Sequence, residues 1–102
     1  MKKLTPAEIR AALPAVPEWK RRGAVISRTW ILEDFPAALA FVLRVGRLAE
    51  AAQHHPDIDI RWNRVTLALT THDAGGLTAR DFQLAAQLDG LNGGAPRRRR
   101  KS

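Results

Sequence analysis

The sequence predicts an α+β domain in which three helices pack on one face of a four-stranded antiparallel sheet, in the order α-β-β-α-β-β-α. Two observations predict this fold. Three segments carry apolar residues at helical spacing, each behind a residue that can cap a helix. The two segments between them alternate apolar with polar residues on either side of a turn, as hairpins do. Such a sheet shows one face to the helices and leaves the other open to solvent or a partner.

The first helix is expected to begin after Thr5 and to end at about Leu13. Thr5 suits the N-cap and Pro6 the first helical position. Glu8 stands three residues after the cap, where its carboxylate can complete a capping box. Pro14 follows and ends the helix.

The first hairpin is expected to start at Trp19 and to turn near Arg22 and Gly23. Its return strand alternates, which indicates one buried face and one exposed face. The inward residues are Ile26, Trp30 and Leu32, and the outward residues are Ser27 and Thr29.

Asp34 is the expected cap of a long core helix. Apolar residues recur there at intervals of three and four, which places them on one stripe. The stripe consists of Phe35, Ala38, Leu39, Val42, Val45, Leu48, Ala49 and Ala52. Because His55 precedes Pro56, a position that disfavours the α conformation, the helix is expected to stop at about His54.

A second hairpin is expected to turn at Asn63 and Arg64. The inward residues of its strands are Ile58, Ile60, Trp62, Val65, Leu67 and Leu69. By this parity His72 lies on the opposite face. After a loop at residues 73–76, Thr78 is expected to cap a last helix that ends around Gly90. The residues expected inward on that helix are Phe82, Ala85 and either Leu88 or Leu91.

The composition describes one globular domain with a basic end. The 102 residues are 45% hydrophobic and 26% charged, as in ordinary soluble domains. The net charge is +7, but the last five basic residues supply most of it, and residues 1–96 carry 12 basic and 10 acidic side chains. Those five are Arg97, Arg98, Arg99, Arg100 and Lys101. We expect a single domain over residues 1–94 and a disordered basic tail over residues 95–102, with weak, salt-sensitive attraction to polyanions.

Several classes of protein are excluded by what the sequence lacks. It has no cysteine, which removes disulfides, thiolate nucleophiles and cysteine-ligated metals. Pro6, Glu8 and Arg10 stand where the apolar core of an export signal would lie. The longest apolar stretch, residues 35–43, is too short to cross a bilayer. We therefore expect a soluble, cytoplasmic protein with no membrane partner.

The three histidines form the clearest chemical feature. His54, His55 and His72 lie within 19 residues, and imidazoles donate and accept protons near neutral pH. Glu50 precedes His54 by four residues and would share its face on a helix. Asp81 follows the glycine loop beyond His72. Adjacent histidines point in different directions, so His54 and His55 should have different roles.

Each of these residues also has a structural interpretation. His54 would be stabilised by the dipole at a helix C-terminus, and His72 could end a strand on a solvated face. Asp81 completes a capping-box pattern with Thr78. Tryptophans such as Trp62 more often fill a core or an interface than bind a ligand. The set as a whole, rather than any single member, indicates acid/base chemistry.

Residues 50–82 resemble the signature of the pterin-4a-carbinolamine dehydratases. That signature has an acidic residue, a His-His-Pro run, an aromatic residue, a Thr-His pair at the end of the next strand and an Asp after a glycine-rich loop. The matching residues are Glu50, His54, His55, Pro56, Trp62, Thr71, His72 and Asp81. The resemblance covers most of residues 5–92. Two features depart from the family: the first hairpin is shorter, and the arginine-rich end is not part of its pattern.

The resemblance implies an enzyme that removes water from a 4a-hydroxytetrahydropterin to give a quinonoid dihydropterin, in tetrahydrobiopterin recycling. His54 and His72 would be the main acid/base groups and His55 mainly a substrate-binding group. Glu50 would orient His54, and the residues shaping the pocket would be Trp62, Thr71 and Asp81. Because the pterin is the substrate, no separate cofactor or metal is implied. The family's assembly implies a homodimer or homotetramer.

The sequence leaves other functions open. Three imidazoles can hold zinc, although two adjacent histidines splayed by a chain bend rarely reach one ion. A binding module is another alternative, since the open sheet face or the basic tail could recognise a protein or nucleic acid, and some members of the family also serve as dimerisation partners of a transcription factor. A role in pterin or molybdenum-cofactor metabolism in place of recycling also fits the residues.

Overall fold

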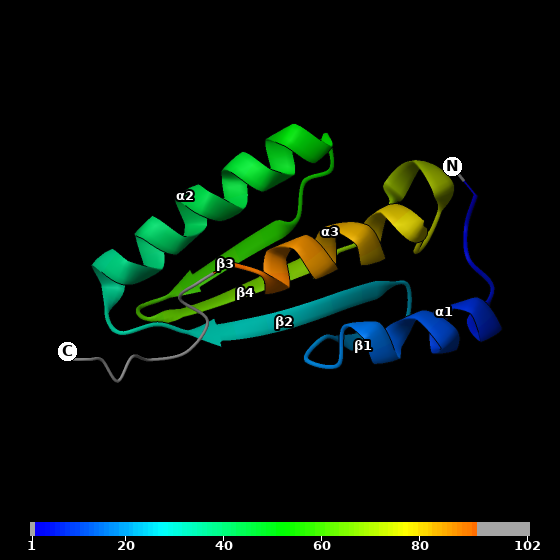
Figure 1. The fold of residues 1–102 in the computed structure, drawn as a ribbon, viewed down its shortest axis with the longest axis horizontal. Helices are drawn as coiled ribbons and strands as arrows, with labels where there is room; N and C mark the ends of the chain where they lie inside the picture. The colour runs from blue at the N-terminus through cyan, green and yellow to red at the C-terminus, as the bar shows by residue number, and fades with distance from the viewer. Residues whose placement is uncertain (1, 92–102) are drawn as a thin grey trace.

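The computed structural model describes residues 2–91 and confirms the predicted fold class and chain order (Figure 1). The predicted domain end at residue 94 and the predicted tail over residues 95–102 lie outside the described residues. The helices are α1 (Pro6–Ala12), α2 (Phe35–Ala52) and α3 (Ala79–Asp89), with short 3-10 turns at Leu13–Ala15 and His72–Ala74. The strands are β1 (Lys20–Arg22), β2 (Val25–Ile31), β3 (Asp57–Arg61) and β4 (Arg64–Leu69). All neighbours are antiparallel, in the order β1-β2-β4-β3.

The core lies between the helices and one face of the sheet. β2 and β4 pair Trp30 with Val65 and Ile26 with Leu69, and all four side chains are buried. Each helix contributes to the same buried cluster, through Ile9 of α1, Phe41 of α2 and Leu84 of α3. No helix of residues 2–91 is long and apolar enough to cross a membrane.

Each helix begins where its capping residues predict. Thr5 accepts the backbone N–H of Glu8, and the Glu8 carboxylate accepts the backbone N–H of Thr5. Asp34 accepts a backbone N–H in the first turn of α2. Thr78 caps α3, with Asp81 as the acidic partner of its capping box. These predictions succeed because a cap depends on contacts within three residues.

The buried side of α2 differs from the predicted stripe. The buried residues are Ala38, Phe41, Val45 and Ala49. Phe35 and Leu39, which the stripe includes, are each 43% exposed, whereas Phe41, which it omits, is fully buried. α2 carries apolar residues on two adjacent flanks, so periodicity alone could not decide which flank faces the sheet.

The turn of the second hairpin lies one residue earlier than predicted. β3 ends at Arg61 and β4 begins at Arg64, so Trp62 and Asn63 form the turn. Asn63 exchanges two hydrogen bonds with the backbone of Leu32, at 2.8 and 3.0 Å. Trp62 takes the left-handed conformation of the turn, with φ 51°, and its ring is exposed instead of facing the core.

Candidate active site

The three histidines lie at one end of the sheet, where the C-terminus of α2, the end of β4 and the N-terminus of α3 meet (Figure 1). They line an open cavity of about 270 Å³, close to the lower end of the range for small-molecule sites. The full lining is Gln53, His54, His55, Thr70, Thr71, His72, Asp73 and Arg80. The fold therefore brings both stretches of the predicted site to one place.

A left-handed residue at the end of α2 separates the two adjacent histidines. α2 ends at Ala52, and Gln53 has φ 53° and ψ 42°, which turns the chain out of the helix. The backbone N–H of His54 then donates to the carbonyl of Ala49 at 3.1 Å. His54 is only 8% exposed, whereas His55 remains on the surface. The two imidazoles thus have different surroundings, as their adjacency predicts.

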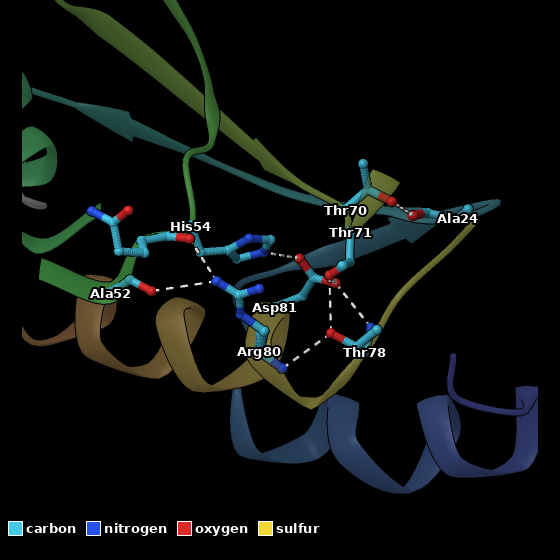
Figure 2. Close-up of polar contacts among 9 residues, drawn as sticks. Ala24, Ala52, His54, Thr70, Thr71, Thr78, Arg80 and Asp81 are labelled. Carbon is cyan, nitrogen blue, oxygen red and sulfur yellow. Dashed lines mark hydrogen bonds and ion pairs between the residues drawn. The ribbon is translucent and has the colours of Figure 1, made fainter. Parts of the chain in front are cut away.

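His54 contacts Asp81, a carboxylate buried at the N-terminus of α3 (Figure 2). Its Nε2 lies 2.5 Å from Oδ1 of Asp81, and Asp81 is 0% exposed. Oδ2 of Asp81 also accepts the backbone N–H of Thr78 at 2.9 Å, which completes the helix cap. Asp81 therefore has two roles: it caps α3, and it contacts a histidine of the cavity directly.

The hydrogen bonds around Asp81 determine the tautomer of His54. A carboxylate only accepts, so the Thr71 hydroxyl donates to Oδ2 of Asp81 at 2.8 Å. The Thr78 hydroxyl then donates to that of Thr71 at 2.9 Å and accepts the backbone N–H of Arg80 at 3.2 Å. By the same rule, Nε2 of His54 carries a hydrogen and donates it to Asp81. In the neutral imidazole, Nδ1 is therefore the nitrogen with a free lone pair.

Glu50 pairs with His55 and not with His54, which corrects the expectation from the sequence. Nε2 of His55 lies 3.3 Å from Oε1 of Glu50, and the side chains are 61% and 72% exposed. The expectation placed His54 on the helix, four residues after Glu50. Because α2 ends at Ala52, that geometry does not form, and the turn brings His55 to Glu50 instead.

His72 begins the 3-10 turn after β4 and does not extend the strand. β4 ends at Leu69, and an isolated bridge pairs Thr71 with Gly76 across the loop. His72 is exposed, and within residues 2–91 its ring has no hydrogen-bond partner. Both ring nitrogens are therefore available to a molecule in the cavity.

Three residues of the predicted set do not line the cavity: Glu50, Trp62 and Asp81. Glu50 and Asp81 contact its histidines instead. Trp62, which we expected to shape the pocket, lies in the β3–β4 turn and does not line it. Four residues that line it were not predicted: Gln53, Thr70, Asp73 and Arg80. The position of Arg80 beside Asp81 in the first turn of α3 could have indicated it. Gln53 carried no such signal, because few residues other than glycine adopt a left-handed conformation.

Among the described residues, no three His, Asp or Glu side chains could hold a metal ion.

Comparison with known proteins relates the described chain to one family. The family model for pterin 4 alpha carbinolamine dehydratase matches residues 2–91. A Roseiflexus sp. (strain RS-1) protein named "Putative pterin-4-alpha-carbinolamine dehydratase" is 59% identical over 87 residues, which cover 85% of this chain and 94% of that protein. A Nocardia farcinica protein of the same name is 57% identical over 88 residues, which cover 86% and 93%.

Solved structures have the same fold. The crystal structure of a transcriptional coactivator/pterin dehydratase from Brucella melitensis has a TM-score of 0.81 at 31% identity and covers 86% of this chain and 96% of that one. A pterin dehydratase-like protein identified as a RuBisCO assembly factor in the alpha-carboxysome has a TM-score of 0.60 at 19% identity, covers 76% and 89%, and is similar in fold alone. The family model spans the whole described chain and the relatives are identical to it at more than half of the aligned residues, so this chain belongs to the pterin-4-alpha-carbinolamine dehydratase family.

Proposed function

We propose that this protein removes water from a 4a-hydroxytetrahydropterin, in agreement with its family. In this reaction the bond from the ring carbon to the hydroxyl oxygen breaks, and the hydroxyl leaves as water after it gains a proton. The neighbouring ring nitrogen loses a proton as a carbon–nitrogen double bond forms. One proton is supplied and one is removed, so the products are water and a quinonoid dihydropterin. The observation that carries the proposal is one cavity lined by three imidazoles in different surroundings: His54 contacts Asp81, His55 contacts Glu50, and His72 is exposed.

His54 suits the role of the base. Asp81 accepts its Nε2 hydrogen, so the negative carboxylate stabilises the imidazolium that forms when Nδ1 takes a proton from the substrate. The buried position of both groups strengthens this attraction, because water screens it little. Thr71 supports the arrangement by donating to the other oxygen of Asp81.

His72 suits the role of the acid, and His55 that of a binding group. His72 is exposed and lines the cavity, so its ring can reach the departing hydroxyl and donate a proton to it. His55 and Glu50 form an exposed pair at the side of the cavity that can hydrogen-bond the polar edge of a pterin ring. This division gives the adjacent histidines separate tasks.

The direct test follows the decay of freshly made 4a-hydroxytetrahydropterin by stopped-flow ultraviolet absorbance, with and without protein. We expect a rate that rises in proportion to protein concentration. The double variant His54→Gln/His72→Gln is the matched control and should leave only the spontaneous rate. A wild-type protein that does not accelerate the decay at any concentration would exclude this function.

The exposed flank of α2 favours a homodimer or homotetramer. Phe35, Leu39 and Leu43 are exposed at a spacing of four residues, which forms an apolar stripe along the helix. Burial of this stripe against a second copy would remove apolar surface from water. Sedimentation should give an oligomer for the wild type and a smaller species for Leu39→Glu. A monomeric wild type at micromolar concentration would contradict this assignment.

The basic run at residues 97–101 supports weak attraction to polyanions, separate from the dehydratase reaction. Deletion of residues 96–102 should abolish salt-sensitive binding to heparin or RNA and leave turnover unchanged. Loss of turnover in the deletion variant would assign this run to the enzyme instead. We place the reaction in the cytoplasm, in tetrahydrobiopterin recycling, because the family resemblance implies that role and a chain without cysteine is compatible with a reducing compartment.

A further inference from the structure

We propose that Arg80 is a positioning residue, which stabilises the left-handed turn at Gln53 and thereby directs His54 and His55 toward the cavity. The expected change in turnover rests on the proposed function. The structural part of the inference concerns the junction between α2 and β3 and can be measured without turnover.

The side chain of Arg80 binds the last carbonyls of α2. Its Nη2 donates to the carbonyl oxygen of Gln53 at 2.5 Å and to that of Ala52 at 3.4 Å. Figure 2 shows this side chain reaching from the first turn of α3 to the end of α2. The last carbonyls of a helix have no partner within the helix, and they carry partial negative charge. A guanidinium, which is always protonated, suits this position.

The turn at Gln53 needs such support because it is strained. A residue with a Cβ rarely adopts φ 53°, and glycine is the usual residue at this position after a helix. Gln53 donates from its own side chain to the Glu50 carbonyl at 2.8 Å, but this contact stays within α2. Arg80 binds the carbonyl of the turn residue itself and so joins it to α3.

Arg80 and Asp81 together hold the chain on both sides of one peptide bond. Arg80 binds the carbonyl of Gln53, and the neighbouring Asp81 binds the imidazole of His54. Both side chains extend from the first turn of α3, so both contacts join the end of α2 to the start of α3. Without the Arg80 contact, Asp81 would still hold the imidazole of His54, but the backbone of His54 and His55 would relax.

The kinetic test compares Arg80→Ala, Arg80→Lys and the control Arg47→Ala, an exposed arginine of α2 that does not line the cavity. Arg80→Ala should lower kcat by about tenfold or more, with a smaller change in KM, because misplaced groups lose rate more than binding. Arg80→Lys should recover part of this loss, since an ammonium can donate to one carbonyl. Arg47→Ala should match the wild type. A loss confined to KM would overturn the proposal, because it would assign Arg80 to substrate contact.

A second variant tests the strain directly. Glycine adopts the left-handed conformation freely, so Gln53→Gly should reduce the need for Arg80. Replacing Arg80 with alanine should therefore cost a smaller factor in kcat in the Gln53→Gly background than in the wild type. Equal losses in the two backgrounds would show that Arg80 does not act through the turn.

The structural readout uses the three histidines, whose imidazole nitrogens can be observed by ¹⁵N NMR of the intact protein. Arg80→Ala should shift the signals of His54 and His55, and Arg47→Ala should leave them in place. Unchanged imidazole signals in a folded Arg80→Ala variant would overturn the proposal. If the wild type proves inactive, the dehydratase assignment fails while these spectra still decide whether Arg80 positions the histidines.

Discussion

The two ends of α3 each carry an aspartate that accepts hydrogen bonds from distant parts of the chain, but only one end borders the histidine cavity. At the N-terminal end, Asp81 accepts from His54, Thr71 and the cap of its own helix. At the C-terminal end, Oδ1 of Asp89 accepts Nε1–H of Trp19 at 2.7 Å and Nη1–H of Arg28 at 2.6 Å.

The difference lies in the partners. An imidazole gains and loses a proton near neutral pH, whereas an indole and a guanidinium keep theirs. Both partners of Asp89 also pack against a buried ring. The ring of Trp19 packs edge-on against Trp30 at 5.8 Å, and the guanidinium of Arg28 lies 4.4 Å from the centre of the Trp30 ring. The same residue type therefore contacts a titratable ring at one end of the helix, where we propose the chemistry, and proton-retaining partners at the other.

Helix polarity adds to this contrast. The positive end of the α3 dipole favours the carboxylate of Asp81, and the negative end disfavours that of Asp89. Arg28 offsets the second effect by placing a positive charge on Asp89. Substitutions at the two ends should consequently separate activity from stability.

The largest expected effect comes from the histidines of the cavity. His54→Gln and His72→Gln should each lower kcat by about 100-fold or more, because each removes one proton-transfer step. Glutamine at position 54 can still donate to Asp81, so the variant should stay folded. The measurement is steady-state turnover of the 4a-hydroxytetrahydropterin beside circular dichroism. Full turnover in either variant would refute the role of that histidine.

A smaller effect on turnover, combined with a loss of stability, is expected for Asp81→Asn. The amide nitrogen must face either His54 or the Thr71 and Thr78 donors, so at least one hydrogen bond to a charged, buried acceptor is lost. We expect a decrease of about 2–3 kcal/mol in the free energy of unfolding and a drop in kcat of about tenfold. Urea denaturation and turnover measure the two. An Asp81→Asn variant as stable as the wild type would contradict the hydrogen-bond assignment.

Asp89→Asn is the matched substitution at the other end and should leave kcat unchanged. Its amide oxygen can accept from Trp19 or Arg28 but lacks the charge, so stability should fall by about 1–2 kcal/mol. The same urea denaturation measures it. If Asp89→Asn lowered kcat as much as Asp81→Asn, the two ends of α3 would not be functionally distinct.

The sequence predicts local features well and long-range contacts less well. The caps at Thr5, Asp34 and Thr78 depend on residues within three positions, and all three were predicted. The partner of His54 was not, because Asp81 is 27 residues away and the contact depends on a single left-handed residue, Gln53. Helical spacing instead predicted Glu50 as the partner of His54, because the two side chains would share a face if α2 continued through residue 54.

The buried face of α2 shows the same limit. Periodicity identified the helix and most of its apolar residues but could not choose between two flanks, so it included Phe35 and left out Phe41. That choice is made by the sheet and α3, which no local pattern describes. The family resemblance, in contrast, correctly predicted that the three histidines lie together. A family signature depends on contacts between distant residues, which no single stretch of sequence contains.

The smallest expected effect is that of Glu50→Gln, and it decides which carboxylate serves which histidine. The pair of Glu50 and His55 is exposed on both sides, so water and salt screen it and it should contribute little. We expect a rise in KM of about two- to fivefold at low salt, with kcat unchanged, and a smaller rise at high ionic strength. Turnover at two salt concentrations measures this. If Glu50→Gln instead lowered kcat as much as Asp81→Asn at both concentrations, Glu50 would be acting on the base, and the contact of His54 with Asp81 would not be the one that matters during the reaction.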